Sequence, residues 1–168
     1  MVKRIILAAL CLSFFVVCFS ETAHSFEAIY ECNEQLLQKF PNVEAIKKHF
    51  GNEAKWQEKT IPSPHDDSLE LRLNSMEYPG ITINTLGYFL DDEHRFFLTL
   101  VNVEKAGIVD FLGIDLGSAR EDVIKKFGEP QNIDGNELNY YDESEYMVIT
   151  FILEEETVIG MKLINYLD

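Results

Sequence analysis

The stretch Gly113-Ile-Asp-Leu-Gly-Ser-Ala-Arg-Glu-Asp-Val-Ile-Lys-Lys-Phe-Gly-Glu-Pro130 decides the fold. It reads as the end of a strand, a tight turn, one short helix and a helix stop. Ser118 is spaced to accept a hydrogen bond from the amide of Glu121, whose carboxylate can reach back, which predicts a capping box. Gly128 can take the left-handed conformation that ends a helix, and the proline after it prevents the helix from resuming. Apolar residues at spacings of three and four predict the inward face: Val123, Ile124 and Phe127.

The first 25 residues predict a signal peptide. Lys3 and Arg4 form a basic start, residues 5–19 are apolar, and small residues fit cleavage after Ser20 or after Ser25. The apolar stretch is too short to cross a membrane, because a spanning helix needs about 20 apolar residues. We therefore expect an exported protein, periplasmic or secreted, without a stable membrane anchor.

Acidic residues dominate the charge of the chain, which has a formal net charge of −15. The excess is greatest after Pro130, where nine acidic residues face one lysine, Lys162. Because nucleic acids and anionic membranes carry the same sign of charge, we expect neither as a partner. Solubility accounts for part of the charge, and a basic protein partner is the more specific interpretation.

Two helices are predicted before the strands. Residues 27–40 place apolar side chains on one helical face, and Asn42 is positioned to cap a second helix over residues 43–50 that stops at Gly51. Cys32 is the only cysteine after the predicted signal. We interpret it as a small buried hydrophobe, because a lone cysteine on a helix is more often that than a nucleophile.

Alternating apolar and polar residues predict the strands. Residues 51–68 are polar and contain prolines, so they predict a loop that can hold a short strand at residues 55–59. The other strands of the first half are predicted at residues 69–74, 81–89, 96–103 and 107–114. Those of the second half are predicted at residues 137–141, 146–153 and 158–166.

The two halves echo each other. Residues 46–51 align with residues 123–128, and Glu77-Tyr78 before an Ile-Thr-Ile strand matches Glu145-Tyr146 before an Ile-Thr-Phe strand. Two matched elements in the same order indicate duplication. We therefore expect an α+β fold with short helices packed on one face of a twisted antiparallel sheet, in two unequal tandem helix-β-meander units. The units are predicted at residues 26–112 and 113–168, after the signal at residues 1–25.

Leu116-Gly117-Ser118, Phe127-Gly128-Glu129-Pro130 and Tyr140-Tyr141 before a long apolar hairpin resemble a helix-then-meander unit of bacterial envelope proteins. One such group is the smallest lipoprotein family of the outer-membrane β-barrel assembly machine. The other is the β-lactamase inhibitor protein group, in which two units sit in tandem and share a concave antiparallel sheet. The repeat is similar to the second group, and the missing lipidation cysteine argues against the assembly role. The motif implies a fold and hardly specifies a partner.

No pattern of catalytic or metal-binding residues stands out. No two histidines after the signal share a metal-ligand spacing, and the acidic runs 65–67 and 91–94 lack the alternating ligands of a calcium loop. No nucleophile elbow or phosphate-cradling glycine loop is present. Glu143 and Glu145 could serve as paired carboxylates, but an exposed hairpin offers neither of them the burial that acid–base catalysis needs. We therefore expect no enzyme, no cofactor and no metal.

The alternation in the last strands assigns two faces. The stronger apolar set should pack on the helix of residues 118–127: Ile149, Phe151, Leu153, Ile159, Met161 and Leu163. The opposite set, with acidic residues at its rim, forms the predicted partner-binding surface: Glu137, Tyr141, Glu143, Glu145, Tyr146, Thr150, Lys162 and Tyr166. The alternative is that the N-terminal helices cover this face and its tyrosines belong to the core.

These observations predict a non-catalytic protein-binding module, most simply an inhibitor or immunity-type partner of a basic enzyme. A structural component of envelope assembly is one alternative. A small-ligand carrier or an enzyme is another, and a closed apolar pocket inside the sheet would favour the carrier.

Overall fold

The structure is a computed structural model that describes residues 25–52, 54–66, 68–90 and 93–166. The predicted signal peptide lies outside these residues except for Ser25. Ser25 is a buried helical residue that accepts a hydrogen bond from the side chain of Gln131 at 2.8 Å.

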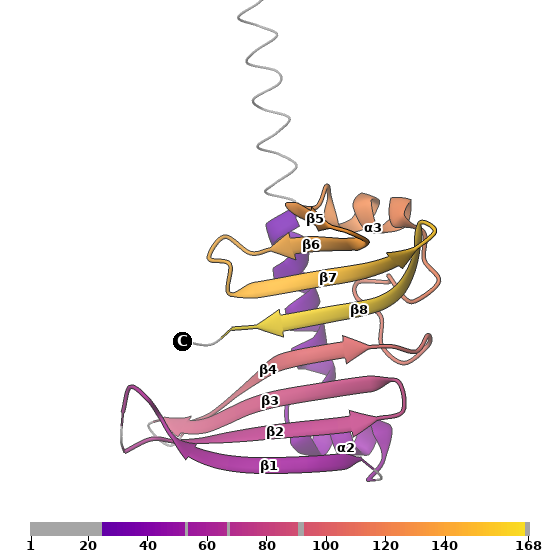
Figure 1. The fold of residues 1–168 in the computed structure, drawn as a ribbon. Helices are drawn as coiled ribbons and strands as arrows, with labels where there is room; N and C mark the ends of the chain where they lie inside the picture. Colours follow the sequence, from indigo (N-terminus) through magenta and orange to yellow (C-terminus); the bar gives the residue numbers. More distant parts are fainter. Residues whose placement is uncertain (1–24, 53, 67, 91–92, 167–168) are drawn as a thin grey trace, which may run out of the picture.

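Within the described residues, eight strands form one antiparallel sheet, which confirms the α+β class (Figure 1). The elements follow one another as a first helix over residues 25–39, α2 (Val43–Phe50), β1 (Lys55–Pro62), β2 (Glu70–Tyr78), β3 (Ile81–Leu90), β4 (Glu93–Val103), α3 (Arg120–Phe127), β5 (Asn132–Asp134), β6 (Glu137–Tyr141), β7 (Met147–Glu154) and β8 (Thr157–Asn165). The order across the sheet is β1-β2-β3-β4-β8-β7-β6-β5. The sheet therefore consists of two meanders whose last strands, β4 and β8, meet in the middle.

The echoes in the sequence fall on corresponding places of the two meanders. Residues 46–51 and 123–128 form or end the helices that precede each meander, α2 and α3. The two Ile-Thr sequences, at Ile81 and Ile149, lie in the third strand of each meander, β3 and β7.

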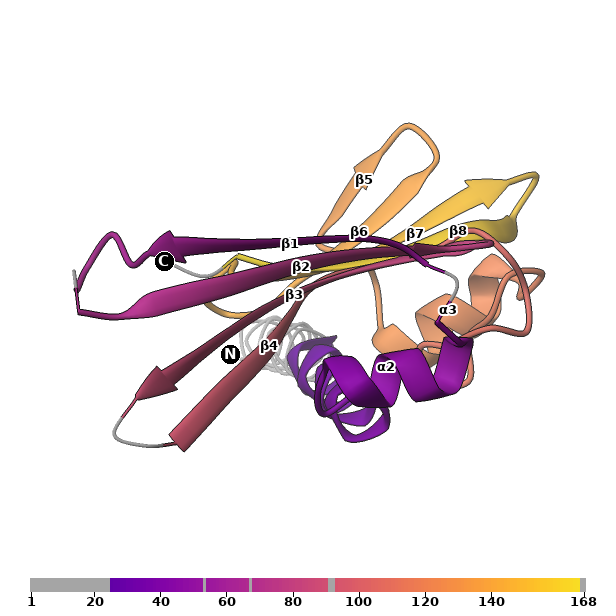
Figure 2. The ribbon, with the colours of Figure 1, turned by 90° about the horizontal axis from the view of Figure 1, so that it is seen from below.

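One face of the sheet carries the core. Residues paired across neighbouring strands lie on the same face, so the registers group the buried residues Met76, Tyr78, Ile81, Ile83, Val101, Val103, Leu138, Tyr140, Ile149, Phe151, Met161 and Leu163. The ring of Phe50 in α2 lies 5.1 Å from that of Tyr78, and the ring of Phe127 in α3 lies 5.0 Å from that of Phe151. Both helices therefore pack on this face, which we call the helix face (Figure 2).

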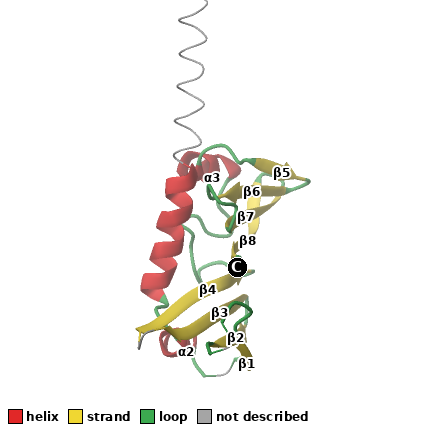
Figure 3. Cartoon of the chain, turned by 90° about the vertical axis from the view of Figure 1, so that its left-hand side faces the viewer, coloured by secondary structure: helices red, strands yellow, loops and turns green. Residues whose placement is uncertain are grey.

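The first helix runs from beside α3 at one end to beside α2 at the other (Figure 3). It buries one apolar stripe, as predicted, through Ala28, Ile29, Cys32, Leu36 and Phe40, the last just past its end. The ring of Phe40 lies 5.5 Å from that of Phe50. Cys32 is fully buried, and this burial raises the pKa of its thiol, so it behaves as the small hydrophobe that was predicted.

The start of α3 differs from its prediction. The capping box at Ser118 is wrong, because the N-cap is Ala119, which has no side-chain cap, and the hydroxyl of Ser118 instead accepts a hydrogen bond from the amide of Asp115 at 3.1 Å. The backbone explains the shift. Amide groups of Val158 and Arg120 bond to the carbonyls of Ser118 and Glu156 at 2.9 Å each, which holds residues 118–120 extended against the β7–β8 turn.

One strand prediction is wrong, and one strand is longer than predicted. Residues 107–114 form turns instead of a strand, because the carboxylates of Asp115 and Asp110 accept hydrogen bonds from the amides of Gly107 and Gly113 at 2.7 Å each. The short strand allowed at residues 55–59 is present and is three residues longer than expected, because β1 runs over Lys55–Pro62.

Ile159 does not face the core as predicted. A register shift in the β7–β8 pair places Val158 opposite Leu153, so Val158 is buried and Ile159 is 45% exposed.

Candidate functional site

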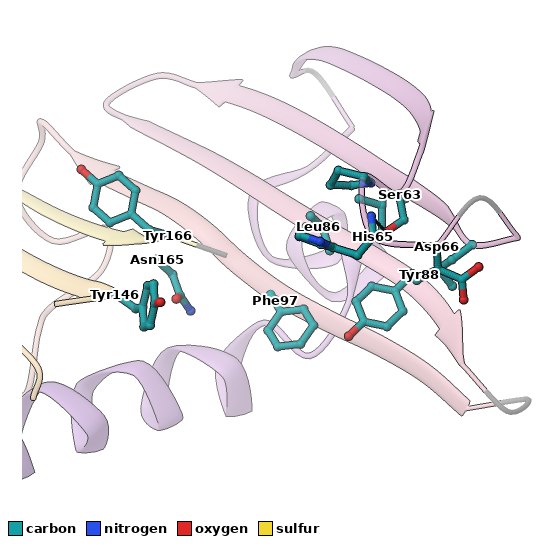
Figure 4. Close-up of a pocket in the computed structure, with 12 residues that line it drawn as sticks. Ser63, His65, Asp66, Leu86, Tyr88, Phe97, Tyr146, Asn165 and Tyr166 are labelled. Atoms are coloured by element: carbon teal, nitrogen blue, oxygen red, sulfur yellow. Dashed lines mark hydrogen bonds between the residues drawn. The ribbon is translucent and has the colours of Figure 1, made fainter. Parts of the chain in front are cut away.

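A groove of about 520 Å³ lies on the face of the sheet opposite the helix face (Figure 4). We call this the open face. The groove is lined mainly by leucines and aromatic residues: Leu69, Leu71, Leu86, Tyr88, Phe97, Tyr146 and Tyr166. The loop at residues 63–66 and Asn165 complete its walls.

The first wall comes from β2, β3 and β4. Leu86 pairs with Leu73 on one side and with Phe97 on the other, and these residues alternate with the buried residues of the helix face. The rings of Tyr88 and Phe97 stack with centroids 6.0 Å apart. The pleat of the sheet therefore directs this apolar set to the open face.

The second wall comes from the ends of β7 and β8. Tyr146 lies just before β7 and Tyr166 just after β8, and the amide of Tyr166 bonds to the carbonyl of Tyr146 at 2.7 Å. These two residues are 45% and 54% exposed. The alternative that helices cover these tyrosines is therefore wrong, and the core tyrosine of this half is Tyr140, which is fully buried.

The groove lies where the two meanders diverge. Strand β4 starts at Glu93, but it pairs with β8 only over Leu100–Val103. A register shift against β3 makes Thr99 an extra residue at the point where the pairing stops. Such a bulge bends and twists its strand, so residues 93–99 lead away from β8 (Figure 1).

A buried carboxylate fixes the turn that carries Tyr146. Asp142 accepts hydrogen bonds from the amide of Met147 at 2.9 Å, the hydroxyl of Ser144 at 2.7 Å and the hydroxyl of Tyr30 at 3.3 Å. Burial alone would raise the pKa of Asp142, but these donors and the amide of Tyr146 favour the charged form, and the pKa is lowered. The carboxylate thus ties the turn to the first helix.

The structure brings together only part of the predicted partner-binding surface. Tyr146 and Tyr166 line the groove, and Glu143 and Glu145 are exposed on the same turn as Tyr146. Thr150 has the predicted phase but cannot present its side chain, because it is 6% exposed and its hydroxyl donates to Asn139 at 2.8 Å.

The other predicted residues share the open face without lining the groove: Glu137, Tyr141 and Lys162.

The first wall was not predicted as part of a site. The sequence pattern predicts Leu71, Leu86, Tyr88 and Phe97 only as strand residues. The short connection between β3 and β4 could have indicated this wall. Leu90 pairs with Glu93, and this hairpin register pairs Leu86 with Phe97 on the same face.

Within the part of the chain that the structure describes, no group of three or more histidine, cysteine or acidic side chains could hold a metal ion. No described helix is long and apolar enough to cross a membrane. The groove also contains His65 and Asp66. The carboxylate of Asp66 accepts hydrogen bonds from the amide and the hydroxyl of Ser68 at 2.9 and 2.6 Å, and the amide of His65 donates to the hydroxyl of Ser63 at 3.3 Å.

Comparisons with protein-family models, curated proteins and solved structures gave no match. The resemblance to tandem helix-then-meander envelope proteins therefore stays a prediction.

Proposed function

We propose that this chain is an exported, non-catalytic protein-binding module that docks a basic protein in its groove, most simply an enzyme that it inhibits. The observation that carries the proposal is the aromatic lining of a groove on the open face. Tyrosine and other large aromatic residues are the usual anchors of protein interfaces, because they bury much area at small entropic cost.

The exposure of the groove favours a protein over a small ligand. Sites for small molecules enclose most of the ligand surface. Here Tyr146 and Tyr166 are about half exposed, so they can contact a facing surface without enclosing a molecule. An apolar side chain on a partner protein fits such a groove better than a free small ligand does.

The charge around the groove favours a basic partner. Asp66 lines it, and Glu143 and Glu145 project from the turn beside Tyr146. The whole chain adds a long-range attraction, since its formal net charge is −15. Charges at the rim of an interface speed association and reject partners of like charge.

Affinity capture tests the proposal. The immobilised chain is exposed to envelope extract beside two variants: the double variant Tyr146→Ala with Tyr166→Ala, and Trp56→Ala. Trp56 is a matched control because it is an aromatic residue with 45% exposure, as Tyr146 has, but it lies on the helix face opposite Met76.

We expect one soluble basic protein to bind the wild-type chain and Trp56→Ala and to be lost from the double variant. Capture of outer-membrane proteins instead would favour the envelope-assembly alternative. Equal capture by all three chains would contradict docking in the groove.

A further inference from the structure

Strand β4 has an unpaired side within the sheet. Alternate residues of an antiparallel strand direct their amide and carbonyl groups to opposite sides. On one side β4 pairs with β3 along its length, but on the other it pairs with β8 only from Leu100 onward. Among the described residues, no strand pairs with the backbone amide and carbonyl groups of residues 93–99 on that side.

The outer edges of the sheet are protected in ways that this segment is not. Natural edge strands avoid further pairing by lysine, proline or short length. β1 carries Lys55, Lys59 and Pro62, and β5 has three residues. Residues 93–99 of β4 contain no lysine or proline, and their one arginine is paired with Glu93 at 2.7 Å.

The unpaired segment borders the groove. Phe97 belongs to both, with its side chain in the first wall and its backbone in the segment. Tyr146 and Tyr166 form the facing wall. An extended chain laid along β4 would therefore place every second side chain in the groove, as peptides do when they add a strand to a sheet.

We infer that the groove receives an extended basic segment of the partner, which adds to β4 as a strand along residues 93–99 and places an apolar side chain between Phe97 and the two tyrosines. This inference rests on the proposed function. Glu143 and Glu145, which are exposed on the turn beside Tyr146, favour lysine or arginine in the segment, whereas Glu93 is already paired with Arg95. A second copy of this chain is a poor occupant, because each copy carries a net charge of −15.

A synthetic peptide tests strand addition directly. The probe is the acetylated and amidated heptapeptide Lys-Ile-Lys-Tyr-Lys-Val-Lys, which alternates basic and apolar residues. Hydrogen exchange of the amides of residues 93–99 is followed by NMR as the peptide is added. We expect saturable binding with a Kd below about 1 mM, and slower exchange at alternate residues of the segment.

Two control peptides separate backbone pairing from attraction between side chains. The first has N-methyl groups at alternate residues, which removes amide donors and keeps every side chain. The second replaces each lysine by glutamate. We expect each control to bind at least about tenfold more weakly than the probe.

The outcomes distinguish this inference from the proposed function. If the probe binds and loses affinity in Tyr166→Ala, but the amides of residues 93–99 exchange as before, strand addition is wrong and docking in the groove stands. Protection of these amides in a chain that captures no protein would keep strand addition and contradict the proposed function. Absence of binding, or equal binding of the N-methylated peptide, would overturn the inference.

Discussion

At the scale of single residues, Asp142 determines where the groove's second wall lies. Its carboxylate joins the turn before β7 to the hydroxyl of Tyr30 in the first helix, at 3.3 Å. Hydrogen bonds to a buried charged group contribute more than those between neutral groups, about 1.5–3 kcal/mol each. A change at this buried residue should therefore alter both the stability of the fold and the position of Tyr146.

The low pKa of Asp142 makes this contribution depend on pH. Because the folded state lowers the pKa below its ordinary value of 3.8, the stabilisation is fully present above that value and is lost as the pH falls through the folded pKa. Asp142→Asn removes the charge at every pH. We expect it to lower the free energy of unfolding at pH 7 by about 1–3 kcal/mol.

Urea denaturation at several pH values measures this difference. The gap between wild type and Asp142→Asn should shrink as the pH drops below 3.8, whereas Asp134→Asn, an exposed change in β5, should show little gap at any pH. A gap that stays constant down to acid unfolding would show that the charge of Asp142 does not stabilise the fold.

At the scale of elements, the turn between β7 and β8 places two glutamates in a backbone conformation that is unfavourable for them. Glu155 and Glu156 have φ values of 47° and 66°, a region that costs a residue with a side chain about 1 kcal/mol or more. Asparagine tolerates this region better than glutamate, and it is common at the first position of such two-residue turns. The turn also matters for α3, because Glu156 accepts the backbone bond from Arg120.

Glu155→Asn should therefore stabilise the protein by about 0.5–1 kcal/mol. Glu154→Asn makes the same chemical change at the end of β7, outside the positive-φ region, and should not stabilise it. Chemical denaturation of both variants provides the comparison. If the two have equal stabilities, relief of backbone strain is not the reason for any gain.

The elements show what the sequence could and could not predict. Asn42 caps α2 as predicted, accepting from the amide of Ala45 at 2.8 Å, because a cap depends on neighbours in the chain. The similar prediction at Ser118 is wrong because residues 156–158, which are distant in sequence, hold its backbone extended. Local rules fail where a non-local pairing competes with them.

The same reasoning applies to the candidate site. The outward phase of Tyr146 and Tyr166 follows from the alternation of β7 and β8 and could be predicted. The first wall follows from the pairing of β2, β3 and β4, but the groove between the two walls depends on where β4 stops pairing with β8 and on the bulge at Thr99, which no local pattern indicates. Burial of Thr150 also depends on a neighbour in another strand, Asn139.

At the scale of the whole molecule, net charge and local anchors should act on different steps of binding. Glu143→Gln and Glu145→Gln, combined, should slow association with the captured partner and reduce its dependence on salt, because rim charges steer the encounter. Glu154→Gln is the control, since Glu154 is exposed at the opposite end of β7. Equal association rates for all variants between about 50 and 500 mM salt would contradict steering by this rim.

The central claim is that the groove holds the partner, and the rate of dissociation tests it most directly. Surface plasmon resonance measures the rate at which the captured partner dissociates from the wild-type chain, from Tyr166→Ala and from Trp56→Ala. Loss of a central aromatic anchor should cost about 2 kcal/mol, so dissociation from Tyr166→Ala should be about thirtyfold faster, with Trp56→Ala unchanged. Dissociation of the partner at the same rate from all three chains would contradict the account.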